Sequence, residues 1–186
     1  MKIIILSLSF FVSLAANAEP YFIQCYDFRC KSTSEIRYQP WQWESIRQLF
    51  NTDQSSAAQE KQAIRRAIAM MEDFSGQISG TSVDKAGNYP GYDMVKQQDC
   101  IDESTNTFQY LSALEELNLL KWHRVEPKQR RIVWLFTHWT AVISEITSGQ
   151  NFAVDSWFRD NGEPPYIQRI ENWRKKKKFS AQYNPD

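Results

Sequence analysis

The chain is poor in the residues that mark fibrous and low-complexity proteins. Its 186 residues include only 6 glycines and 7 prolines, which excludes a collagen-like chain and the glycine- and proline-rich low-complexity classes. Lysine and arginine number 22, as do aspartate and glutamate, so no global basic field favours general nucleic-acid binding. Hydrophobic residues form 42% and aromatic residues 14% of the chain, which supplies enough apolar surface for one compact domain of ordinary size.

A membrane-length apolar run is also lacking. Lys2 precedes an apolar run from Ile3 to Ala16, which is shorter than the roughly 20 residues that a spanning helix needs. Small residues at the ends of Ala16-Asn17-Ala18 occupy the two positions that a signal peptidase reads, and no cysteine follows to carry a lipid. The sequence therefore predicts a signal peptide over residues 1–18, an exported chain over 19–186 and no integral membrane segment after cleavage.

Cysteine is scarce, and export changes how the 3 cysteines are interpreted. Disulfides persist outside the cytoplasm. Cys25 and Cys30 are close enough in sequence to pair across a short turn, although close spacing does not guarantee disulfide geometry. Cys100 has no evident partner in the chain, so it is a partner in an intermolecular disulfide, a free functional thiol or a buried, inert side chain.

The hydrophobic pattern changes along the exported chain from a helical period to β-rich runs. Apolar residues at helical spacing predict helices, and runs of β-branched and aromatic residues predict strands. Helices first and an antiparallel sheet afterwards indicate a single α+β domain with a basic C-terminal tail. The predicted elements are a hairpin or loop at 21–38, a helix from Pro40 through Phe50, a helix from an Asp53 N-cap to about Gly76, a loop at 76–98, a helix at 100–120, a strand at 131–143, a turn at 147–151 and a strand at 152–158.

Three polar residues at separated points of the sequence form a candidate catalytic set. Asp99 is a predicted N-cap, which places Cys100 in the first turn of a helix, where free N–H groups and the helix dipole favour a thiolate. His138 and Asp155 lie in consecutive apolar strands, and each needs a partner because burying an unpaired polar group costs ~1–3 kcal/mol. Together they supply a nucleophile, a base and a group that orients the base.

The strand register decides whether the histidine and the aspartate meet. A turn centred on Gly149 pairs Asp155 with about Val142, and this leaves His138 about 13 Å away along the strand at ~3.3 Å per residue. His138 and Val142 lie on the same face of their strand, because side chains alternate between the two faces. We therefore expect a bulge, or a longer connection that starts near Glu145, to bring His138 and Asp155 together.

Negative charge around the thiol is a second constraint. Three acidic residues (Asp99, Asp102 and Glu103) surround Cys100 in sequence, and nearby negative charge disfavours a thiolate. Thiol chemistry at this position therefore depends on a protonated His138 at short range.

The order of these three residues, cysteine, histidine and then aspartate, resembles that of the transglutaminase-like superfamily. Within it, the sequence is nearest to the bacterial transglutaminase-like cysteine proteinases. The resemblance covers roughly residues 60–158 and is carried by the segments 98–103 (QDCIDE), 138–142 (HWTAV) and 152–157 (FAVDSW). It implies a papain-like fold, with Cys100 as nucleophile, His138 as base and Asp155 as orienting acid. It also implies a periplasmic protein that cleaves peptide bonds.

Further site residues follow from the resemblance and from the chemistry. No cofactor is required, but calcium is implied by the acidic motif of the family, although Ile101 stands where that family carries an acidic residue. The candidate calcium ligands are Asp99, Asp102 and Glu103. The candidate oxyanion donors are the backbone N–H of Cys100 and the side chains of Gln97 and Gln98.

The remaining prominent residues have structural or surface interpretations. We expect His123 to cap a helix or to lie on the surface. The aromatic side chains of the C-terminal half are expected in the core or in a cleft wall: Trp134, Trp139, Trp157 and Phe158. A solvated tail or a contact with an anionic surface is expected of Arg174, Lys175, Lys176, Lys177 and Lys178.

These observations predict an exported thiol-dependent hydrolase or acyl transferase that acts on amide bonds of proteins or peptides. Two alternatives stay open. The acidic surroundings of Cys100 favour a non-catalytic binding or assembly module on the same fold. Cleavage of amides in cell-wall peptides is the other alternative.

Overall fold

The computed structural model describes residues 19–51, 54–89, 94–133, 136–179 and 184. The signal peptide predicted over residues 1–18 therefore lies outside the described residues. The elements are β1 (Tyr21–Tyr26), β2 (Ser32–Arg37), α1 (Pro40–Asn51), α2 (Ala57–Ser79), a 3-10 turn (Thr81–Val83), α3 (Cys100–Glu116), β3 (His123–Val133), β4 (Phe136–Glu145), β5 (Asn151–Asp155), β6 (Tyr166–Arg169) and α4 (Ile170–Arg174).

The described strands form two antiparallel sheets, the hairpin β1-β2 and a four-stranded sheet in the order β3-β4-β5-β6. The predicted α+β class is confirmed, but a hairpin precedes the helices and α4 follows the last strand. The run predicted as one strand over 131–143 is instead the end of β3 and most of β4. β3 was missed because it is an edge strand rich in charged residues, whose sequence lacks an apolar alternation.

Helix α2 is longer at its C-terminus than predicted. Its N-cap is Ser56, whose hydroxyl accepts the N–H of Gln59, and the predicted cap Asp53 lies outside the described residues. Gly76 does not end the helix; it lies within it, and a Cβ there would come within 2.8 Å of the Ser82 hydroxyl. Gly80 ends the helix instead, in a left-handed conformation (φ 83°) that favours glycine.

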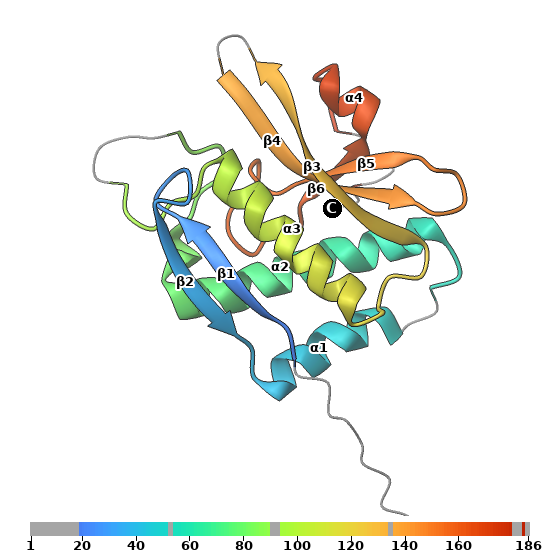
Figure 1. Cartoon of the computed structure of the whole chain (residues 1–186), viewed down its shortest axis with the longest axis horizontal. Coiled ribbons are helices and arrows are strands. Elements are labelled where there is room, and N and C mark those ends of the chain that lie inside the picture. The colour runs from blue at the N-terminus through green and yellow to red at the C-terminus, as the bar shows by residue number, and fades with distance from the viewer. Residues whose placement is uncertain (1–18, 52–53, 90–93, 134–135, 180–183, 185–186) are drawn as a thin grey trace, which may run out of the picture.

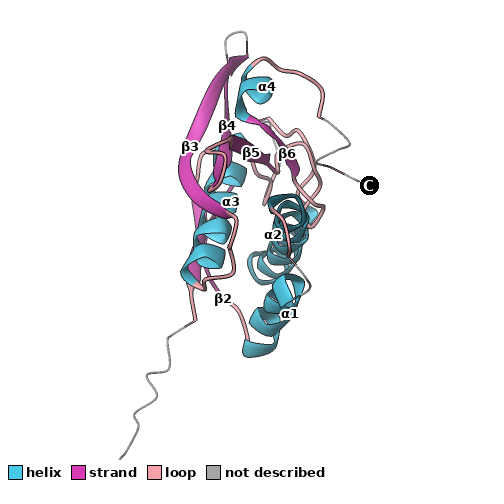
Figure 2. Ribbon diagram, turned by 90° about the vertical axis from the view of Figure 1, so that its right-hand side faces the viewer, coloured by secondary structure: helices cyan, strands magenta, loops and turns pink. Residues whose placement is uncertain are grey.

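Helix α3 is packed on several sides. Its buried Leu111 and Leu114 belong to a core that also contains Phe22 of β1, Ile64 of α2 and Ile143 of β4. Figure 1 shows α3 passing between the β1-β2 hairpin and the four-stranded sheet, and in Figure 2 α1 and α2 lie together on one side of the molecule. Helix α3 therefore contacts both sheets.

Within the described ranges, no helix combines the length and the apolar character that crossing a membrane requires.

Candidate functional site

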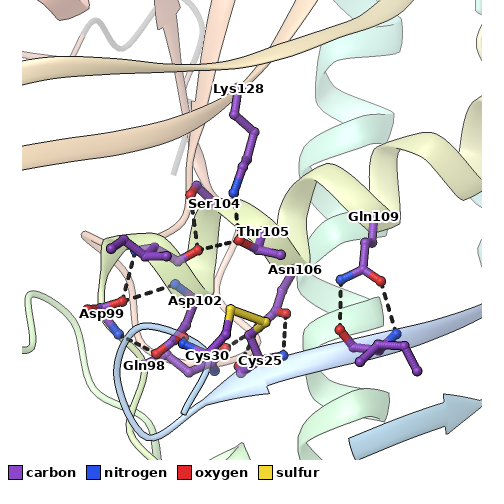
Figure 3. Close-up of a disulfide and its surroundings, with 12 residues drawn as sticks. Cys25, Cys30, Gln98, Asp99, Asp102, Ser104, Thr105, Asn106, Gln109 and Lys128 are labelled. Atoms are coloured by element: carbon purple, nitrogen blue, oxygen red, sulfur yellow. Dashed lines mark hydrogen bonds between the residues drawn. A yellow bond between two sulfur atoms is a disulfide. The ribbon is translucent and has the colours of Figure 1, made fainter. Parts of the chain in front are cut away.

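A disulfide-closed loop is tied to the first turn of α3. Cys25 and Cys30 are bonded, which confirms the pairing that the spacing permits, and the four residues from Asp27 to Cys30 all have φ between 53° and 65°. The N–H of Cys30 donates to Asp102 Oδ1 at 2.5 Å. Asn106 binds both backbone groups of Cys25, at 2.8 and 2.9 Å (Figure 3). The loop therefore fixes one side of the turn that carries Cys100.

Asp99 caps α3 as predicted. Its carboxylate accepts the N–H groups of Ile101 and Asp102, and the Asp102 carboxylate accepts the N–H of Asp99 at 3.2 Å, which completes a capping box. Cys100 is thus the first residue of the helix. Asp99 takes the next two N–H groups, while the N–H of Cys100 itself interacts with the sulfur of the same residue.

The Cys100 thiol lies against the edge of β4 on both sides of His138. The half-buried sulfur is 3.6 Å from the carbonyl oxygen of Thr137, and the N–H of Trp139 donates to it. β4 pairs with β5 only from Ala141 onward. The sulfur therefore contacts β4 beyond its pairing with β5, at residues that pair with β3 on the other side.

His138 is a buried imidazole with a fixed orientation. Its Nε2 lies 2.8 Å from Asp155 Oδ2, and the indole N–H of Trp173 donates to the same oxygen at 2.7 Å. The imidazole packs among the rings of Trp157, Phe158 and Trp173, whose centroids are 4.8 to 5.6 Å from its own. Because Asp155 occupies Nε2, Nδ1 is the ring nitrogen that remains for proton transfer with a thiol.

The register explains why this pair forms. The last β4-β5 pair is Ala141 with Val154, so Asp155 follows one step later and is offset from His138 by two residues rather than the expected four. Side chains at that diagonal offset are within reach of each other. β4 ends at Glu145 and β5 begins at Asn151, so the turn at 146–150 lies earlier than the turn predicted at 147–151. This earlier turn, and not the bulge or longer connection that the sequence predicts, brings Asp155 closer to His138.

Cys100 separates two hollows of one cleft. The larger, of about 440 Å³, is lined by Arg29, Asn88, Tyr89, Asp99, Cys100, Ile101, Phe136, Thr137, Trp139 and Trp157. The smaller, of about 210 Å³, is lined by both Cys100 and His138, and otherwise by Tyr89, Arg131, Phe136, Thr137, Trp157, Phe158 and Lys176. A hollow of about 590 Å³ at the start of α2 contains none of the predicted catalytic residues.

The aromatic prediction is confirmed for three of its four residues. Trp139, Trp157 and Phe158 are cleft walls, whereas Trp134 lies outside the described residues. Tyr89 and Phe136 also form the walls, and both are largely exposed. The sequence gives no pattern that assigns these two residues to a cleft, because they come from separate parts of the chain and meet only in the fold.

The charges around the thiol set its resting state. Burial raises the pKa of Cys100, and the negative charges of Asp99 and Asp155 raise it further. Burial also raises the pKa of Asp102 to about 7 and, together with Glu72 and Asp84, holds the pKa of Glu103 well above its usual range. Cys100 is therefore a thiol at rest that needs a base.

The three predicted calcium ligands do not share a site. Asp99 and Asp102 use their oxygens on backbone N–H groups, and Glu103 is buried against Asp84. Among the described residues, one group of potential metal ligands lies close enough together to hold an ion, namely Cys25, Cys30 and Asp102. Its two sulfur atoms are bonded to each other in the disulfide, so they are not thiolate ligands. The residues therefore do not fit calcium as a group, and calcium binding stays a prediction.

The side chains of Gln97 and Gln98 are used within the fold and do not line the cleft. Gln97 donates to the Val83 carbonyl at 2.8 Å and accepts the N–H of Lys85, while the Gln98 side chain accepts a hydrogen bond from Asn106. The structure therefore gives no support to these two side chains as oxyanion donors, and the N–H of Cys100 is the remaining candidate.

His123 corrects the sequence interpretation. It is 1% exposed, and its Nδ1 lies 2.8 Å from Glu60 Oε1 of α2, so it neither caps a helix nor lies on the surface. Trp173 was missed as a site residue. No sequence pattern indicates the contacts of either residue, because each partner comes from a distant element.

Comparison of the chain with protein-family models, with curated proteins and with solved structures found no match.

Proposed function

We propose that the chain is a thiol-dependent hydrolase or acyl transferase that acts on amide bonds of peptides or proteins. One observation carries the proposal. His138, oriented by Asp155 through a 2.8 Å hydrogen bond, lines the same hollow as the Cys100 thiol. A thiol at a helix start, a neighbouring imidazole and a carboxylate behind it are the parts that nucleophilic acyl transfer requires.

In the proposed reaction His138 Nδ1 takes the proton of the Cys100 thiol as the sulfur attacks the amide carbonyl. The N–H of Cys100, at the start of α3, donates to the oxygen as it becomes negative. His138 then returns the proton to the leaving amine, and a thioester remains. Water hydrolyses the thioester, or an amine takes the acyl group in a transamidation. Asp155 fixes the tautomer of the imidazole throughout.

The proposal includes a transglutaminase-like fold and a periplasmic location. The order of the elements supports the fold, since the cysteine begins a helix and the histidine and aspartate follow on adjacent antiparallel strands. The Cys25–Cys30 disulfide is compatible with export to an oxidising compartment.

Reactivity of the thiol tests the proposal. We expect Cys100 to react with iodoacetamide at pH 6 faster than free cysteine does, because the imidazole takes its proton. His138→Ala should slow this alkylation about 100-fold, the lower range for loss of a general base. Cys100→Ala should abolish it and leave the circular dichroism spectrum unchanged.

The non-catalytic module is the second candidate, and the raised pKa of Cys100 favours it. It predicts a thiol that reacts no faster than free cysteine, and no change on His138→Ala. That result would rule out the acyl-transfer proposal. If the thiol is active, release of muropeptides rather than protein fragments would identify the cell-wall amidase.

A further inference from the structure

The walls of the cleft carry positive charge, although the chain as a whole has no net charge. Arg29 lines the larger hollow, and Arg131 and Lys176 line the smaller one. Among the described residues, none of these three cations has a carboxylate within salt-bridge distance. The acidic side chain that lines the cleft is Asp99, which is 7% exposed and is used in the cap of α3.

Two of the cations are brought together by one carbonyl group. Arg131 Nη1 and the backbone N–H of Lys176 both donate to the carbonyl oxygen of Trp173. The Arg131 guanidinium lies over the Trp173 ring, 4.5 Å from its centroid, and its Nε is buried without a hydrogen-bond partner among the described residues. The charge of Asp155 acts on this half-buried guanidinium, but Asp155 lies beyond salt-bridge distance and its Oδ2 is bound by His138 and Trp173. The guanidinium can therefore still donate to an incoming anion.

The rest of the smaller hollow is apolar. Its walls are the rings of Tyr89, Phe136, Trp157 and Phe158, with Cys100 and His138 at one boundary. At about 210 Å³ the hollow is smaller than the sites of drug-sized ligands, so it suits a single side chain or chain end. Its occupant would lie next to the carbonyl that Cys100 attacks.

We propose that the smaller hollow binds a carboxylate of the substrate beside the scissile amide, with its stem against the aromatic rings and its charge facing Arg131 and Lys176. This inference rests on the proposed function and adds the substrate class, an acidic polypeptide. Such a carboxylate belongs either to an aspartate or glutamate side chain or to a free C-terminus.

The local charge is measured with two alkylating reagents that differ in charge. Iodoacetate is an anion and iodoacetamide is neutral, so the ratio of their rates at Cys100 reports how the cleft treats a carboxylate. We expect a ratio about fivefold or more above that of free cysteine, since one charge at close range in water changes a rate by about that factor. Raising the salt concentration to 0.5 M should lower the ratio, because the Debye length shortens to a few ångströms (~3 Å at 1 M).

Variants locate the charge. Lys176→Gln should lower the ratio severalfold without changing the iodoacetamide rate by a similar factor. Arg131→Gln should also lower the ratio, but because Arg131 contacts Trp173 its iodoacetamide rate is expected to change as well. Arg124→Gln, the same change on the same strand but outside both hollows, is the matched control and should leave the ratio unchanged. Lys176 is exposed, so its variant is expected to fold even if Arg131→Gln does not.

A peptide digest separates the two sources of the carboxylate. Mass spectrometry of peptides cleaved from a mixed library should show enrichment of aspartate and glutamate beside the cut. Enrichment only near unblocked C-termini, and its loss in C-terminal amides, would assign the carboxylate to a chain end. A thiol that reacts fast with iodoacetamide but shows no preference for iodoacetate overturns this inference alone. A thiol inert to both reagents overturns the proposed function and this inference with it.

Discussion

At the scale of single residues, one oxygen atom organises the site. Asp155 Oδ2 lies within hydrogen-bond distance of both the His138 imidazole and the Trp173 indole. Trp173 is fully buried and also packs against the imidazole, with ring centroids 5.6 Å apart. We infer that Trp173 is a positioning residue, which acts on the thiol through Asp155 and His138.

Trp173→Phe keeps a ring in place and removes the indole N–H. We expect a loss of about 1.5–3 kcal/mol in the free energy of unfolding, the usual contribution of a hydrogen bond to a charged group. We also expect slower alkylation of Cys100 and an altered pH profile of that rate. Trp122→Phe also removes an indole hydrogen bond, to the neutral Gln54 carbonyl, and Trp122 lines neither hollow of the cleft. This control should destabilise the fold without altering the pH profile; equal profiles for both variants would assign Trp173 a purely structural role.

Residues with a local signal were predictable and those with a distant partner were not. The Asp99 cap follows from its spacing to the α3 pattern, and the buried position of His138 follows from its apolar neighbours. The bond between Trp173 and Asp155 and the bond between His123 and Glu60 join separate elements. A single sequence carries no local pattern for such pairs.

At the scale of elements, the β1-β2 hairpin acts on α3 through its closed loop. The residues from Asp27 to Cys30 have left-handed φ values that side chains disfavour, and the disulfide holds them there. Cys25→Ser with Cys30→Ser should reduce the free energy of unfolding by about 2 kcal/mol for so short a loop. The Cys30–Asp102 hydrogen bond should loosen with it, which would expose the first turn of α3 to hydrogen exchange.

Reduction provides the control for this element. Dithiothreitol should lower the urea midpoint of the wild-type chain to that of the double-serine variant and should leave the variant unchanged. A wild-type midpoint that does not respond to reduction would show that the hairpin is held by its other contacts, including the two Asn106 hydrogen bonds.

Elements with a strong apolar period were predicted close to their true bounds. The helix from Pro40 and the helix from Cys100 are examples. Most of β3 was missed because an edge strand needs few apolar residues. The end of α2 was placed too early because Gly76 serves close packing inside the helix and does not mark its end. In both cases the tertiary neighbours, and not the local sequence, decide the outcome.

At the scale of the whole molecule, the fold buries a group of carboxyl side chains between α2, α3 and the loop before α3. Burial raises the pKa of Glu72 to about 8 and that of Asp84 to about 6, and Glu103 is raised well above its usual range. Asp84 Oδ1 also accepts the N–H of Gln98, just before the Asp99 cap, at 2.6 Å. The protonation of this group is thereby linked to the segment that carries Cys100.

The stability of the protein should therefore fall as the pH rises from 5 to 8. Each carboxyl group has a higher pKa in the folded than in the unfolded chain, so the folded state holds protons that the unfolded state has released above about pH 4–5. The stabilisation is complete below that pH and is lost, at up to roughly 1.4 kcal/mol per pH unit for each proton, as the pH passes through the folded pKa values. Glu103→Gln replaces a protonated carboxyl group with a neutral amide, so urea unfolding at pH 5 and pH 8 should show a smaller decline than in the wild type. Glu116→Gln, a change at an exposed residue at the other end of α3, should keep the wild-type dependence of the free energy of unfolding on pH. If that dependence is also unchanged in Glu103→Gln, Glu103 is already ionised at pH 5.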